Sequence, residues 1–123
     1  MRTQHHGFTL VELVMVIILL GILAAFAIPK FIDLSTDAKI AAVNGVAAAL
    51  SAGNSINYVS RKANATKGVA IANCQDVALT LQGGALPSGY TITSLAVGVD
   101  VTVTCTLNGL SGTTATFIAT GIT

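Results

Sequence analysis

Few residues of this chain have the type and spacing that catalysis requires. The two histidines stand side by side in the polar leader MRTQHH, and the chain has no nucleophile–base pair and no glycine-rich phosphate loop. The acids beyond position 12 are scattered, and no Cys or His partner stands at metal-ligand spacing. We therefore expect no enzyme activity, no catalytic residue, no cofactor and no metal site.

Glu12 is the residue whose surroundings give it chemical interest. It is the only charged residue from Phe8 to Pro29, at the start of an otherwise aliphatic run. An ionised carboxylate in hydrocarbon costs on the order of a few kcal/mol, so the acid has either a use or a partner that neutralises it. The alternative is a boundary residue whose side chain reaches the membrane interface.

Cys74 and Cys105 are the two cysteines, and both lie beyond the apolar run. An even count in a domain that is expected to be exported indicates one disulfide. Such a bridge would close a loop of about 30 residues and contribute roughly 3–4 kcal/mol on the chain-entropy estimate. The alternative is two free buried thiols in a cytosolic protein.

The apolar run is long enough to cross a bilayer. At 1.5 Å per residue, a helix over Phe8–Pro29 spans roughly 33 Å. The leader carries Arg2 and the initiator amine but no acid, so it is expected to stay in the cytoplasm while the rest is exported. A discarded secretory signal is the alternative, but the run is long, Glu12 interrupts its start, and helical periodicity continues past Pro29.

Composition limits what remains to one small domain. The chain has 123 residues, of which 53% are hydrophobic and 9% charged, and its formal net charge is +1. Bulk electrostatics therefore favour neither nucleic acid nor an acidic surface as a partner. The low aromatic fraction and the absence of Trp also weaken a stacking-based ligand site.

A single long helix is expected from about Thr9 to Tyr58. Gly21 and Pro29 should weaken it, because glycine lowers helix propensity and proline lacks an N–H. Beyond Pro29 the sequence becomes amphipathic, with apolar residues at three- and four-residue spacing. The predicted buried stripe comprises Phe31, Leu34, Ala38, Ala41, Ala42, Val46, Ala49, Leu50, Gly53 and Ile56.

The remainder is expected to form a small β-rich head. A loop is predicted at Ser60–Asn73, a short helix or strand at Cys74–Leu81, and strands at Tyr90–Ala96, Asp100–Leu107 and Thr114–Thr120. The alternation in the last two strands turns one set of side chains to a single apolar face, namely Val101, Val103, Cys105, Leu107 and Phe117. The predicted fold class is α+β, a long N-terminal helix packed on a small antiparallel sheet of about three to four strands.

A specific resemblance lies in the N-terminal motif. Gly7 is followed by Phe8-Thr9-Leu10-Val11-Glu12 and then by an aliphatic stretch with Gly21 and Pro29. This pattern resembles the class III signal of the type IV prepilin family, whose pilin fold matches the predicted class. Within that family, the segment from Pro29 to Lys39 is most similar to mannose-sensitive haemagglutinin pilins.

The resemblance implies a division of the chain and a role for each motif residue. Residues 1–7 would be a leader that prepilin peptidase cuts off between Gly7 and Phe8, and Phe8 would then be N-methylated. Residues 8–58 would be the helix, with 8–29 crossing the membrane and later lying in a filament core, and 59–123 the head. Glu12 would dock on the amine of a neighbouring subunit, and Gly21 and Pro29 would be the place where the helix breaks.

The predicted function is therefore structural. The chain is expected to be a type IV pilus subunit that forms a helical homo-oligomer, with a role in surface adhesion, biofilm formation, motility or DNA uptake. It would first be a single-pass precursor in the inner membrane, where prepilin peptidase and the pilus assembly platform are its partners, and then an extracellular pilus component. A surface receptor or DNA partner stays unknown. The alternatives are a type II secretion pseudopilin and a membrane-anchored binding protein that never polymerises.

Overall fold

The computed structural model describes residues 7–123, without the side chains of residues 31–33. Most of the predicted leader and the predicted burial of Phe31 therefore lie outside the described residues. The chain divides into two compact units, one that ends at Thr36 and one that covers Asp37–Thr123. The elements in chain order are α1 (Leu10–Ala63), the 3₁₀ helix η1 (Cys74–Thr80), β1 (Thr91–Ile92), β2 (Thr102–Asn108), the short 3₁₀ turn η2 (Leu110–Gly112) and β3 (Thr114–Thr120).

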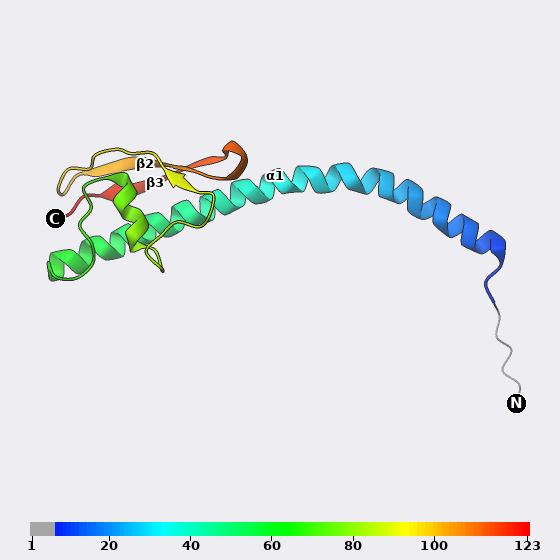
Figure 1. Ribbon diagram of the computed structural model, residues 1–123, viewed down its shortest axis with the longest axis horizontal. Coiled ribbons are helices and arrows are strands. Elements are labelled where there is room, and N and C mark those ends of the chain that lie inside the picture. The colour runs from blue at the N-terminus through cyan, green and yellow to red at the C-terminus, as the bar shows by residue number, and fades with distance from the viewer. Residues whose placement is uncertain (1–6) are drawn as a thin grey trace, which may run out of the picture. The chain divides into compact units, whose positions relative to one another are not determined.

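The second unit is built on an antiparallel sheet of three strands in the order β1-β2-β3. β2 and β3 pair along their whole length, from Thr102 opposite Thr120 to Asn108 opposite Thr114. Both strands lie along the second half of α1 (Figure 1). The α+β class is confirmed, and the sheet has the lower of the two strand numbers expected.

The faces of β2 and β3 follow the predicted alternation. Cys105, Leu107, Phe117 and Ala119 are buried, while Ile118 on the opposite face is exposed. Val101, predicted to continue the apolar face, lies outside β2 and is exposed.

The first predicted strand is shorter than expected. Only Thr91–Ile92 pairs regularly with β2, because the backbone beyond it bonds to a different segment. Val97 donates to the carbonyl of Ala72, and Leu95 accepts from the amide of Cys74. These bonds bring the chain after β1 to the start of η1.

The buried face of α1 differs from the predicted stripe. Leu50 is buried and Val46 half-buried as expected, but Ile56 is 69% exposed, and so are Leu34, Ala38, Ala41, Ala42 and Ala49. The prediction was wrong at these positions because it counted apolar residues only, whereas the helix face that meets the head starts at Val43 and continues with two asparagines. The residues of α1 that are buried are Val43, Ala47, Leu50, Asn54 and Asn57.

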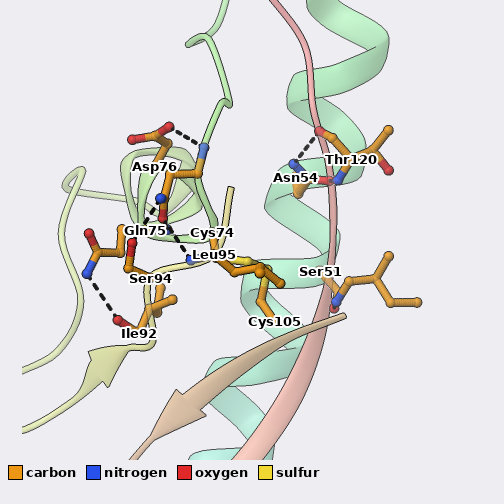
Figure 2. Close-up of a disulfide and its surroundings, with 12 residues drawn as sticks. Ser51, Asn54, Cys74, Gln75, Asp76, Ile92, Ser94, Leu95, Cys105 and Thr120 are labelled. Carbon is orange, nitrogen blue, oxygen red and sulfur yellow. Dashed lines mark hydrogen bonds between the residues drawn. A yellow bond between two sulfur atoms is a disulfide. The ribbon is translucent and has the colours of Figure 1, made fainter. Parts of the chain in front are cut away.

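Those asparagines, with Ser51, bond the backbone that lies beside α1. The Ser51 hydroxyl oxygen accepts from the Ile118 amide at 3.1 Å, and Asn54 accepts from the Thr120 amide at 2.8 Å. The Asn54 side chain also donates to the Thr120 carbonyl at 3.2 Å (Figure 2). Because β3 has a strand on one side only, Ser51 and Asn54 satisfy edge groups that a further strand would otherwise bond.

Asn57 continues this series one helical turn later. It accepts from the Val69 amide at 2.8 Å and donates to the Val69 carbonyl at 2.9 Å. Ser51, Asn54 and Asn57 stand three residues apart and so share one face of the helix. We call these three side chains the polar ladder of α1.

The predicted disulfide is confirmed. Cys74 at the start of η1 and Cys105 in β2 are bonded, with a Cα–Cα distance of 5.8 Å, and both are buried (Figure 2). η1 itself is fixed by a capping box, in which Asn73 accepts from the Gln75 amide and Asp76 accepts from the Asn73 amide. The bridge therefore joins a well-capped turn to the middle strand of the sheet.

The helix continues past its predicted end at Tyr58 and stops at Ala63. The added residues place Lys62 one turn after Tyr58, and both side chains bond the carboxylate of Asp100. Two basic residues, Arg61 and Lys62, lie in the last turn, where a positive charge favours the negative end of the helix dipole. Tertiary contacts and the dipole thus extend a helix whose local sequence looked like a loop.

Candidate processing and assembly site

The N-terminal motif is held by a hydrogen-bonded box between Thr9 and Glu12. The Thr9 amide donates to Glu12 Oε2 at 2.9 Å, and the Glu12 amide donates to Thr9 Oγ1 at 3.2 Å. The Thr9 hydroxyl also donates to Glu12 Oε2 at 3.0 Å. Thr9 is therefore the N-cap of α1, which begins at Leu10, and Glu12 completes a reciprocal capping box.

Thr9 is a residue whose importance the sequence reasoning missed. The signal was present, since a Thr followed three residues later by Glu ahead of an apolar run is the pattern of a capping box. The box fixes the Glu12 carboxylate against the first turn of the helix. The carboxylate is thereby held within hydrogen-bond distance of the Thr9 amide, next to Phe8 in the sequence.

The bond between Gly7 and Phe8 lies outside the helix and is open. Phe8 is 85% exposed, and a Cβ on Gly7 would meet nothing within 4 Å. The fold of the subunit therefore does not require glycine at position 7. A requirement for glycine must come from a molecule that grips this segment from outside.

The first half of α1 is an uncovered apolar surface. From Leu10 to Ile28 the large apolar side chains are exposed, and an 18-residue window in this helix has a mean hydropathy of 2.9 with no residue buried. By length and composition, α1 is the one helix in the described chain that could cross a membrane. Such a surface needs lipid or other protein to cover it.

Gly21 and Pro29 lie within this helix, which is continuous through both in the subunit. Pro29 has no N–H to donate to the carbonyl one turn earlier, so the helix lacks one hydrogen bond there. A Cβ on Gly21 would meet nothing within 4 Å, so packing inside the subunit does not explain that glycine either.

Residues 7–12 and the apolar helix together define a class of protein. Residues 2–28 match the prokaryotic N-terminal methylation motif. The class is that of chains with such a motif, one apolar helix and a small α+β head. Within the described residues, no group of three or more His, Cys, Asp or Glu side chains is placed to hold a metal.

The relatives narrow this class. The type IV narrow pilus major component PilA5 of Thermus thermophilus is 41% identical over 88 residues, which cover 72% of this chain and 69% of that protein. The type II secretion system core protein G of Pseudomonas aeruginosa is 39% identical over 51 residues, 42% of this chain and 36% of that protein. No solved structure matches significantly. The chain belongs to the type IV pilin family.

Family membership confirms the general resemblance and the location. The precursor is a single-pass protein of the inner membrane that later enters a pilus, as the methylation motif ahead of the apolar helix indicates. The finer similarity to mannose-sensitive haemagglutinin pilins stays a prediction.

Proposed function

We propose that this chain is the structural subunit of a type IV pilus and that it assembles through α1. The observation that carries the proposal is the uncovered apolar half of that helix, which begins with a capped carboxylate at Glu12. Copies that bury this surface against one another in place of lipid form a core, and head-to-tail contacts that do not close extend it into a helical filament.

Processing supplies the charge that Glu12 needs. Prepilin peptidase cuts between Gly7 and Phe8, and the new amine of Phe8 is N-methylated. The open backbone at Gly7 suits an extended fit in a protease cleft. The cut creates a cation beside the positive end of α1, and such a cation is stabilised best by a carboxylate in a dry environment.

Glu12 then docks on the Phe8 amine of a neighbouring copy. In its own subunit the carboxylate is already bonded by Thr9, which reduces the cost of holding the charge in the membrane before assembly. In a low-dielectric core, an ion pair stabilises the assembly more than it would on a wet surface. Loss of one partner leaves the other charge buried and unpaired. Gly21 and Pro29 mark the stretch where α1 loses helicity during packing.

The similarity also offers a second candidate, a type II secretion pseudopilin. The relative of that kind matches over 51 residues, fewer than α1 contains, whereas the match to the pilus component covers 88 residues and must extend into the head. The similarity to the pilus component therefore includes part of the head as well as α1. We therefore favour the pilus subunit, whose head serves adhesion, biofilm formation, motility or DNA uptake.

Electron microscopy of sheared surface fibres, with mass spectrometry of their subunit, tests the proposal. A pilus subunit yields fibres whose subunit begins at methylated Phe8. The Glu12→Ala variant should be cut normally but yield no fibres, while Glu12→Asp, which keeps the charge, should retain some. Normal fibres from Glu12→Ala would contradict the docking role, and the absence of fibres from the unaltered chain would favour a monomeric anchored binder.

A further inference from the structure

A hollow in the head lies between α1, η1 and the segment that follows α1. It has a volume of about 300 Å³, and its lining includes Ile56 from α1, Leu79 from η1 and Lys67 from the connecting segment. Ile56 is 69% and Leu79 53% exposed. We call this hollow the head groove.

The groove depends on a close approach between the two helices. A Cβ on Gly53 would lie 2.6 Å from the Thr80 hydroxyl, so only glycine lets η1 come this near to α1. Asn57 of the polar ladder fixes the third wall by bonding both backbone groups of Val69. Close packing and hydrogen bonds thus hold the walls in place, and the groove is a formed feature of the head.

The chemistry of the groove is apolar with one cation. Ile56 and Leu79 present aliphatic surface to solvent, and Lys67 is exposed at the edge. Among the described residues the ion pair formed is that of Lys62 with Asp100, so Lys67 has no acid of its own subunit beside it. A complementary partner carries an exposed apolar side chain next to an unpaired carboxylate.

One segment of the chain itself has that chemistry. Three of the four acids whose side chains are described already accept hydrogen bonds from their own subunit, namely Glu12, Asp76 and Asp100. The fourth, Asp37, is exposed and accepts none. Ile40 lies three residues further along α1, on the same face, and is 45% exposed.

We propose that the head groove of one copy takes the Asp37–Ile40 face of α1 of a second copy, with Asp37 paired to Lys67 and Ile40 placed against Ile56 and Leu79. This inference rests on the proposed function, which requires copies to meet through different surfaces. Ile40 and Ile56 are 16 residues apart on α1, so parallel helices that place Ile40 on Ile56 are displaced by roughly 24 Å along their axes. Groove and helix face are different surfaces, and the displacement along the axis prevents closure into a ring, so the contact repeats along a filament.

Disulfide trapping in filaments tests the contact. The two native cysteines are bonded to each other, so introduced cysteines are the free thiols of the chain. The double variant Asp37→Cys, Lys67→Cys should give a ladder of dimers, trimers and longer species on non-reducing gels of sheared filaments. Each single variant should run as a monomer, and so should Asp37→Cys with Ser88→Cys, which places the second thiol elsewhere on the head. Assembled filaments of the first pair that run as monomers would overturn the proposal.

Exchange of the two charges gives a second test, which does not depend on whether the cysteine variants form filaments. Lys67→Asp or Asp37→Lys alone should lower the yield of sheared filaments about tenfold, because like charges then meet at the contact. The double exchange should restore the yield, whereas Lys67→Asp with Ser88→Lys, which returns a positive charge elsewhere on the head, should not. Equal rescue of the filament yield by both pairs, or a normal filament yield from the single variants, would overturn the groove contact while leaving the filament role intact. Absence of filaments from the unaltered chain would overturn both.

Discussion

Lys62 Nζ lies 2.6 Å from Asp100 Oδ1, a contact that ties the last turn of α1 to the loop before β2. Tyr58 donates its hydroxyl hydrogen to the same carboxylate oxygen at 2.9 Å, and the Lys62 ammonium lies 5.4 Å from the centre of the Tyr58 ring. The Asp100 amide in turn donates to the carbonyl of Gly121. One acid thus joins the end of the helix, the loop and the C-terminal residues.

This contact predicts how stability depends on pH. The hydrogen bonds from Lys62 and then Tyr58 hold the pKa of Asp100 below its ordinary 3.8, and the bond to Asp100 raises the pKa of Lys62 above 10.5. The ionised aspartate stabilises the folded head above pH 3.8, and this stabilisation is lost as the pH falls through the lowered pKa. The charged lysine stabilises the folded head below pH 10.5, and this stabilisation is lost as the pH rises through the raised pKa.

Asp100→Asn should therefore lower the thermal unfolding midpoint between these two limits and converge with the unaltered chain outside them. Asn suits the position because Asp100 has a left-handed backbone, φ 58°, which Asn also tolerates. Thermal unfolding of the mature chain in detergent, followed by near-ultraviolet circular dichroism across pH, measures this. Asp37→Asn, which removes no ion pair, is the control, and a pH-independent difference for Asp100→Asn would contradict the linkage.

Asn54→Ala should destabilise the head by about 2–3 kcal/mol, because it leaves the amide and carbonyl of Thr120 without partners at the edge of β3. Ser55→Ala removes an exposed hydroxyl that bonds only within the helix, and should change stability by less than about 0.5 kcal/mol. Chemical denaturation of both variants in detergent gives the two values. Equal effects would show that the polar ladder contributes little.

Two glycines of α1 should respond in opposite directions to alanine. Gly45→Ala meets nothing within 4 Å and should stabilise the helix by about 1 kcal/mol. Gly53→Ala would push against Thr80 and should destabilise by about 1–3 kcal/mol. The same denaturation measurement applies to both, and stabilisation by Gly53→Ala would contradict the close approach of η1.

Thr9→Ala should loosen the first turn of α1. It removes the hydroxyl that accepts from the Glu12 amide, a loss of about 1 kcal/mol, or roughly fivefold faster local amide exchange. Thr9→Ser keeps the hydroxyl and should exchange at the original rate. Hydrogen exchange of the precursor in detergent, read at the Glu12 amide, distinguishes them, and equal rates in both variants would argue against the capping box.

The sequence predicted those features that depend on local pattern. Alternation in β2 and β3 gave the faces of Cys105 and Phe117 correctly, and cysteine count with expected export gave the disulfide. The N-terminal motif predicted the family, because its residues are read in linear order. These features need no knowledge of which distant segments meet.

What the sequence did not reveal depends on partners far along the chain. Asn54 occupies the core face because it bonds Thr120, and that bond links residues 66 positions apart. Because Asn54 occupies the core face, Ile56 is turned to solvent, although the count of apolar residues had predicted it to be buried. The extension of α1 to Ala63 likewise depends on Asp100, which no local window includes.

The polar ladder has a consequence for a protein that lives among many copies of itself. An edge strand with free amides and carbonyls is a template on which identical chains add strand to strand, which is how cross-β aggregates grow. By occupying the backbone groups of Ile118 and Thr120, Ser51 and Asn54 close that route at the end of β3. The β3 edge of the head is thereby protected against strand-to-strand addition of further copies.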